Sequence, residues 1–223
     1  MTIPLTQYGL REMLLVSAAC AAAAAICLLT WWPLALLPAV VWAAALAFFR
    51  DPDRHAEGEG FLAVADGTVT DITPVGPEGP LGRKGIRVGV FMSVASVHVN
   101  RAPCQATVVK VEHCGGGYVD VRRQNAWDTN ESSTIYLSVP SGGSEYPVLV
   151  RQIAGYVARR IVTDLAPGQS LHAGQRIGMI KFGSRGELIV PEELVGEVAV
   201  RVGEQVYAGQ SVLIRPRPRE NTE

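Results

Sequence analysis

The stretch Gly85-Ile-Arg-Val-Gly-Val-Phe91 decides the fold class, because its branched apolar residues alternate with other residues over a short span bounded by turns. Similar stretches of four to eight residues recur, separated by turn residues such as Gly76-Pro77 and Gly142-Gly143. They are Gly67–Ile72, Ala106–Val111, Tyr118–Arg122, Thr134–Val139, Val148–Ile153 and Gly196–Val202. The segment Gln152–Ile161 fits either a strand or a short helix. The sequence therefore predicts a mainly β, compact domain.

A repeat near the C-terminus refines this prediction. Ala166-Pro-Gly-Gln-Ser-Leu-His-Ala-Gly-Gln175 matches Arg201-Val-Gly-Glu-Gln-Val-Tyr-Ala-Gly-Gln210 at an offset of 35 residues. The pattern resembles the β-hairpin unit of biotinyl and lipoyl carrier domains, two of which interlock into a flattened barrel. A carrier would bear its cofactor on Lys181, the only lysine in residues 151–223, but the apolar, strand-like neighbours of Lys181 disfavour that function.

The N-terminal segment has a different character. Residues 13–49 contain no charge over 37 positions. One membrane-spanning helix needs about 20 apolar residues, so this run is too long for one helix and barely enough for two. We expect a hairpin of two short helices, roughly 13–30 and 34–49, with Trp31-Trp32-Pro33 at the turn. Residues 1–50 are thus predicted to form a membrane anchor, and residues 51–223 a separate domain of ordinary composition.

Charges beside the apolar segment predict its orientation. Arg11 precedes the hairpin, and Arg50 and Arg54 follow it. Because positive charges favour the cytoplasmic side, both ends are expected there, with the domain on the cytoplasmic side of the cell membrane. The alternative is a cleaved signal peptide ending in Ala18–Ala25, but a second apolar run follows where a soluble chain should begin.

Composition excludes several classes of function. The 223 residues carry 20 Lys+Arg and 21 Asp+Glu, a net charge of -1. Proteins that bind nucleic acid normally have a basic surplus, so no nucleic-acid partner is expected. The four histidines, His55, His98, His113 and His172, are far apart and lack cysteine or carboxylate partners at ligand spacing, so no metal is expected.

Three segments carry candidate chemistry: Ala65-Asp66-Gly67, Val97-His98-Val-Asn-Arg-Ala-Pro103 and Lys181-Phe-Gly-Ser-Arg185. Together they resemble the phosphatidylserine decarboxylase proenzymes of the short bacterial and archaeal type. Arg50-Asp51-Pro52, Asn130-Glu131, Gln152-Ile-Ala-Gly155 and Ala158-Arg-Arg160 extend the resemblance over nearly the whole chain. Where the family commonly has Pro-Phe-Asp before the histidine segment, this chain has Val94-Ala95-Ser96.

The resemblance implies a pyruvoyl group made from the chain itself. Ser184 would attack the carbonyl of Gly183, and elimination and hydrolysis would leave residues 1–183 and a fragment 184–223 that begins with a ketone. The ketone would form a Schiff base with phosphatidylserine, which releases carbon dioxide and phosphatidylethanolamine. His98 would be the base and Asp66 would hold its imidazole, as in a Ser-His-Asp relay. Longer family members have a second histidine where this chain has Arg101, so His98 is the candidate for both steps.

The remaining expectations concern the lipid and the partners. Arginines suit a lipid phosphate, and the candidates are Arg101, Arg122, Arg123, Arg159 and Arg160. Family resemblance also suggests a homodimer. The rival function is a membrane serine peptidase using Ser184 and His98, although the chain lacks a Gly-x-Ser-x-Gly elbow or a Ser-Lys dyad.

Overall fold

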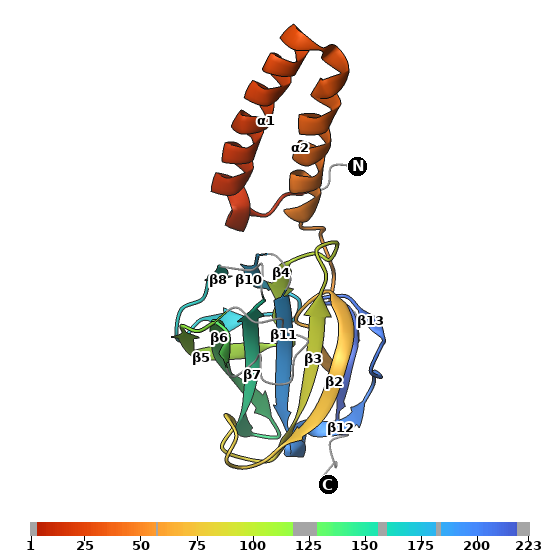
Figure 1. Cartoon of the computed structure of the whole chain (residues 1–223). Helices are drawn as coiled ribbons and strands as arrows, with labels where there is room; N and C mark the ends of the chain where they lie inside the picture. The colour runs from red at the N-terminus through yellow and green to blue at the C-terminus, as the bar shows by residue number, and fades with distance from the viewer. Residues whose placement is uncertain (1–3, 57, 118–128, 156–159, 182–183, 218–223) are drawn as a thin grey trace. The chain divides into compact units, whose positions relative to one another are not determined.

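The computed structural model describes residues 4–56, 58–117, 129–155, 160–181 and 184–217. The chain divides into two compact units, Met1–Asp53 and Arg54–Glu223, each with its own internal contacts (Figure 1). The first unit is helical and the second is built almost entirely of strands. The fold is therefore mainly β with an N-terminal helical hairpin, as the sequence predicts.

The first unit is an antiparallel pair of helices. Its elements are η1 (Gln7–Gly9), α1 (Leu10–Thr30), η2 (Trp32–Ala35) and α2 (Leu36–Phe48). Trp42 donates a hydrogen bond from Nε1 to Ser17 Oγ at 3.0 Å, which joins α2 to α1. The segment Gln7–Thr30, 24 residues long, could cross a membrane by length and composition, whereas Trp32–Phe48 is shorter. Helix α1 begins before residue 13, because Arg11 and Glu12 join its first turn, where an acidic side chain favours the helix dipole.

The two ends of this hairpin meet. Thr6 N donates to Phe49 O at 2.9 Å, and Asp51 N donates to Pro4 O at 2.7 Å. Leu5 and Arg50 also form an isolated antiparallel bridge. The chain therefore enters and leaves the helical pair at the same end.

Short antiparallel strands make up the second unit. They are β1 (Phe61–Leu62), β2 (Gly67–Val75), β3 (Gly85–Met92), β4 (Val99–Arg101), β5 (Ala106–Cys114), β6 (Ser132–Ser141), β7 (Ser144–Ala154), β8 (Ile161–Thr163), β9 (Ser170–Leu171), β10 (Arg176–Ile180), β11 (Ser184–Pro191), β12 (Val195–Val198), β13 (Gln205–Val206) and β14 (Val212–Pro216), with η3 (Glu192–Leu194) between β11 and β12.

Strand β11 lies at the centre of the largest sheet. The order of that sheet is β13-β2-β3-β11-β7-β6-β5-β9, and two smaller sheets have the orders β4-β10-β8 and β1-β14-β12. Figure 1 shows β2, β3, β11 and β7 side by side in the curled sheet. Every residue of β11 is buried, because β3 and β7 flank it and other residues cover both of its faces.

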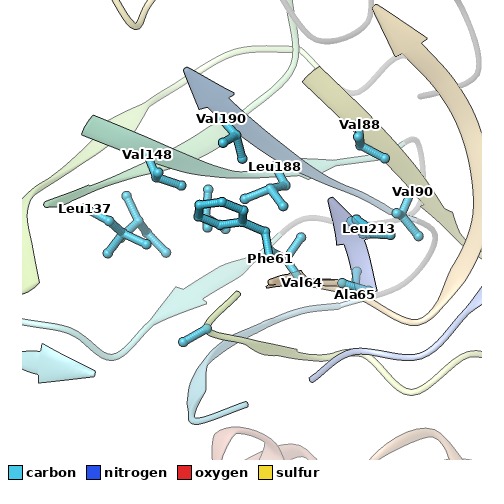
Figure 2. Packing of buried hydrophobic residues seen from close by; sticks show 14 of the residues in the cluster. Phe61, Val64, Ala65, Val88, Val90, Leu137, Val148, Leu188, Val190 and Leu213 are labelled. Carbon is cyan, nitrogen blue, oxygen red and sulfur yellow. The ribbon is translucent and has the colours of Figure 1, made fainter. Parts of the chain in front are cut away.

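One large apolar cluster fills the inside of the curled sheet. Figure 2 shows Phe61 among Val64, Val148 and Leu188, whose side chains come from separate strands and loops. Leu188 and Val190 of β11 belong to this cluster, whereas Ile189 packs on the other face with Leu81 and Leu149. The alternation seen in the sequence thus assigns successive residues to opposite faces of one sheet.

The C-terminal repeat folds as two strand–turn–strand units, β9–turn–β10 and β13–turn–β14. Gly174 and Gly209 occupy the turns with φ of 75° and 71°, a conformation that favours glycine. The turns also touch, since a Cβ on Gly209 would lie 3.1 Å from Gly174 Cα. The matching Ala-Gly-Gln triplets therefore mark the place where the two units meet.

Two strand predictions need correction or qualification. The expected strand Gly196–Val202 is wrong at its C-terminal end, because β12 stops at Val198. Ala199 N still donates to Leu213 O at 2.9 Å, and the turn follows, with Glu204 Oε2 accepting the amide of Arg201 at 3.0 Å. The ambiguous segment Gln152–Ile161 is strand at both described ends. The predicted strand Tyr118–Arg122 lies outside the described residues.

Candidate active site

Ser184 is the first residue of β11 and is fully buried. It stands opposite Met92 of β3 on one side and opposite Ala154 of β7 on the other. Its Oγ donates to the thioether of Met92, with an O–S distance of 3.4 Å. A thioether is a weak acceptor, so the hydroxyl lies in dry surroundings with no strong hydrogen-bond partner among the described residues. Gly183, the other half of the expected cleavage site, lies outside the described residues.

His98 precedes β4 and is also fully buried. Its Nδ1 lies 2.9 Å from the carbonyl oxygen of Ser96. A carbonyl can only accept, so Nδ1 carries the proton, and in the neutral ring Nε2 is the basic nitrogen. The backbone oxygen of His98 accepts the amide of Ile180 at 3.3 Å, which joins the histidine segment to the end of β10, four residues before Ser184.

The turn before His98 holds that carbonyl in place. Ser96 N donates to Ser93 O at 2.9 Å, and Ser96 Oγ accepts the amide of Ser93 at 3.1 Å. This is the place where the chain departs from the family pattern, with a serine instead of the usual aspartate. The serine hydroxyl closes the turn, and the serine carbonyl orients the imidazole.

Asp66 has other partners than the relay hypothesis expects. Its Oδ2 accepts from Arg54 Nη2 at 2.7 Å, its Oδ1 pairs with Arg54 Nη1, and Oδ1 also accepts the amide of Ala208 at 2.8 Å. Among the described contacts there is none between Asp66 and His98. In the uncut chain the Ser96 carbonyl, and not this carboxylate, holds Nδ1. The role of Asp66 in the relay therefore stays a prediction.

A buried chain of polar side chains approaches Ser184 from the side of β4 and β7. Asn100 Nδ2 lies 3.9 Å from Met92 Sδ and donates to Val64 O at 3.2 Å. Gln152 Nε2 donates to Asn100 Oδ1 at 2.8 Å, and Thr163 Oγ1 donates to Gln152 Oε1 at 2.7 Å. Satisfied buried networks of this kind fix side chains in one arrangement. Met92 is thus contacted by both Ser184 and Asn100, which places these segments in one region.

The structure adds residues to the site that were not among the candidates predicted from the sequence. Met92 has no sequence signal of its own, whereas Arg54 drew notice only as a charge beside the apolar segment and Ser96 only as a departure from the family pattern. Asn100 and Gln152 do have one, since both lie in segments that carry the family resemblance. Their contact could not be predicted, because 52 residues separate them in the chain.

The lipid-phosphate candidates differ in burial. Arg101 is 3% exposed and donates from Nη1 to Gly174 O at 3.0 Å, so it supports the turn of the repeat. Arg160 is exposed. Arg122, Arg123 and Arg159 lie outside the described residues. Of the described candidates, Arg160 alone presents its side chain to solvent.

Neither a carrier function on Lys181 nor a metal site gains support from the described part of the chain. Lys181 is 6% exposed, whereas a cofactor-bearing lysine needs to be reached by a modifying enzyme. Within the described residues no group of three His, Cys, Asp or Glu side chains is arranged to hold a metal ion.

Comparison with known proteins gives one family. A model of the phosphatidylserine decarboxylase family matches residues 42–214. A phosphatidylserine decarboxylase proenzyme of Rhodopirellula baltica is 37% identical over 217 residues, which cover 96% of this chain and 89% of that protein. A phosphatidylserine decarboxylase proenzyme of Pelobacter propionicus is 40% identical over 173 residues, which cover 77% of this chain and 76% of that protein. A putative archaetidylserine decarboxylase proenzyme of Methanothermobacter thermautotrophicus is 38% identical, covering 83% and 86%.

Proposed function

The chain belongs to the phosphatidylserine decarboxylase family of carboxy-lyases, and from this premise we propose that it converts phosphatidylserine to phosphatidylethanolamine and carbon dioxide by means of a pyruvoyl group made from Ser184. The relatives are named proenzymes, which agrees with a chain that must be cut before it acts. The observation that carries the proposal is the buried Ser184 at the start of β11, in the segment that matches the family motif.

In the proposed self-cleavage, Ser184 Oγ attacks the carbonyl carbon of Gly183, and the peptide C–N bond breaks to leave an ester and a free amine. A base then removes the Ser184 α-proton, and the Gly183 carboxylate leaves. The dehydroalanine that remains tautomerises to an imine, which water converts to a ketone with release of ammonia. The products are residues 1–183 and 184–223.

His98 is the proposed base for this reaction. A serine hydroxyl is a weak nucleophile and needs a neighbouring group to take its proton. The hydrogen bond from Nδ1 to Ser96 O makes Nε2 the nitrogen that receives it. Asp66, which directly precedes β2 and pairs with Arg54, is proposed to belong to the same site.

The surroundings of Ser184 suit the group that would form there. Conversion would turn the Ser184 side chain, whose Oγ lies 3.4 Å from Met92 Sδ, into a methyl group, so that no hydroxyl would stay buried beside the thioether. Once formed, the ketone at residue 184 would supply an electrophilic carbonyl for the substrate amine and an electron sink for decarboxylation. His98 is the proposed donor of the proton to the substrate α-carbon, after which water would release phosphatidylethanolamine.

The helical hairpin is proposed to anchor the enzyme in the cell membrane with the catalytic domain on the cytoplasmic side. Its two ends meet at Leu5 and Arg50, so both lie on one side of any membrane that the pair enters. Labelling single cysteines at positions 8 and 55 in sealed vesicles tests this, since labels on opposite faces contradict it.

Two further proposals are a homodimer and a contact between Arg160 and the lipid phosphate. The particle mass in detergent checks the homodimer, and the KM of Arg160→Gln checks the phosphate contact.

The variant Ser184→Ala tests the proposed function. It has no oxygen to attack Gly183, so intact mass should give one full-length chain without decarboxylase activity. Ser138→Ala, at a partly exposed position of β6, serves as the matched control and should be cut and active. Borohydride with phosphatidylserine should trap an adduct on residue 184 of the wild type alone.

Three results would contradict the proposal. They are cutting of Ser184→Ala, an adduct at Lys181, and a small fragment beginning with an ordinary amino group. The last of these would favour the serine peptidase instead.

A further inference from the structure

Cutting the chain before residue 184 leaves the reacting group at a free strand end, and the contacts of Arg185 can keep that end in place. This inference rests on the proposed self-cleavage. Once the peptide bond to residue 183 is broken, residue 184 becomes the free end of a strand, and strand ends open more readily than strand centres. The reacting group must nevertheless stay within reach of His98 and the substrate.

Arg185, the next residue, is held by three side chains. Its Nε donates to Glu187 Oε1 at 2.8 Å, its Nη1 donates to Thr70 Oγ1 at 2.8 Å, and its Nη2 donates to Asp71 Oδ1 at 2.9 Å. Nη1 also lies 2.6 Å from Asp71 Oδ2, which makes the ion pair bidentate. Arg185 is 3% exposed and Glu187 is fully buried. Such buried, charge-assisted contacts are stronger than exposed ones.

The guanidinium reaches across a whole strand to make these contacts. Thr70 and Asp71 belong to β2, and β3 lies between β2 and β11. The crossing point is Gly89 of β3, where a Cβ would lie 2.1 Å from Arg185 Nη2 and 2.4 Å from its Cζ. A glycine at this position therefore leaves the space that the guanidinium occupies.

Electrostatics favour the ionised pair. Burial raises the pKa of the Asp71 carboxyl, but the hydrogen bond and charge of Arg185 outweigh it, so the net pKa lies below the ordinary value. Burial lowers the pKa of Arg185, and Asp71 and Glu187 raise it to a net value above the ordinary one. Both groups are therefore charged at neutral pH.

Successive residues of a strand face opposite sides of the sheet, so Arg185 points away from Met92 and the reacting group. Its side chain is fixed on the opposite face of the sheet, and the peptide bond between residues 184 and 185 carries that restraint to residue 184. We propose that Arg185 is a positioning residue that keeps the new terminus at residue 184 in register between β3 and β7 after the chain is cut.

The test compares Arg185→Gln and Arg185→Lys with Arg215→Gln in detergent micelles containing phosphatidylserine. Arg215 is the matched control, because it is exposed and forms a single surface pair with Glu197. For each variant, intact mass gives the cut fraction, carbon dioxide release gives kcat and KM, and amide hydrogen exchange is measured in peptides 185–191 and 86–92.

Arg185→Gln should be cut like the wild type, because the uncut chain still anchors residue 184 on both sides. Its kcat should fall by roughly 10- to 100-fold with KM unchanged, because misplacement of a reacting group by about 1 Å has effects of that size. Exchange should rise in peptide 185–191 more than in 86–92. Arg185→Lys keeps the charge but lacks the planar set of donors, so its kcat and exchange should lie between those of Arg185→Gln and the wild type. Arg215→Gln should match the wild type.

The inference fails if cut Arg185→Gln has the wild-type kcat, or if folded Arg185→Gln stays uncut. Should Arg185→Gln not fold, Thr70→Val removes one hydrogen bond and should lower kcat and raise exchange in the same direction. No change in either quantity for Thr70→Val also overturns the inference. An uncut wild type would instead overturn the proposed function.

Discussion

The two faces of strand β11 have opposite chemistry, although their first residues are adjacent in the chain. On the inner face, Ser184 contacts a thioether, and Leu188 and Val190 join the large apolar cluster. On the outer face, Arg185 and Glu187 form a buried ionic network with β2. One strand can thus present a reactive side chain on its apolar face while ion pairs on its other face hold the strand in position.

The largest expected effect concerns the residues proposed to act on Ser184, which lies on the inner face. His98→Ala and Asp66→Ala should remain folded but largely uncut, with cleavage slowed by at least about 100-fold, because proton transfer by a positioned side chain contributes that much. The exposed residues His113 and Asp164 provide matched alanine controls, which should be cut normally. Cleavage is followed by electrophoresis over time. Wild-type rates in both His98→Ala and Asp66→Ala would contradict the roles proposed for these residues in the reaction of Ser184.

A stability comparison sharpens the difference in packing. Leu188→Ala removes a fully buried side chain from the large cluster and should lower the free energy of unfolding by about 4 kcal/mol. Ile189→Ala, in the small outer cluster with Leu81 and Leu149, should lower it by about 2 kcal/mol. Urea unfolding of uncut Ser184→Ala chains measures both. Equal losses would mean that the two faces pack alike.

The outer face can be tested by filling the space beneath the guanidinium. Gly89→Ala places a methyl group against Arg185 and should cost about 1–3 kcal/mol of unfolding free energy. Gly115→Ala is the control, because nothing lies within 4 Å of a Cβ there. The same urea measurement applies. A neutral Gly89→Ala would show that the network rearranges freely and does not fix the strand.

The smallest expected effect is a dependence of stability on pH. The folded-state pKa of Asp71 lies below its ordinary value of 3.8, so its carboxylate stabilises the fold above about pH 5. That contribution is lost as the pH falls through the folded pKa. The stability difference between the Ser184→Ala chain and the same chain with Asp71→Asn should therefore shrink in acid. A constant difference between pH 7 and pH 3 would contradict the ion pair.

The sequence by itself determined the class of fold, the helical hairpin, the repeat and the family. These features depend on local periodicity and on motifs, such as Ile86, Val88 and Val90 at every second position or the Ala-Gly-Gln triplets. The sequence also identified Ser184, His98 and Asp66 as candidates, because their neighbours in the chain carry the resemblance. It could not give strand ends such as that of β12, since these depend on where the pairing of β12 with β14 ends.

Only the tertiary structure decided which side chains meet. Asp66 pairs with Arg54, His98 bonds to Ser96, and Arg185 reaches Thr70 and Asp71, which lie 115 and 114 residues away in the chain. Such contacts depend on strand order and register, which follow from the packing of the whole sheet and not from any local pattern. A glycine at position 89 looks like a weak strand residue in the sequence, and its purpose is visible only where the guanidinium of another strand crosses it.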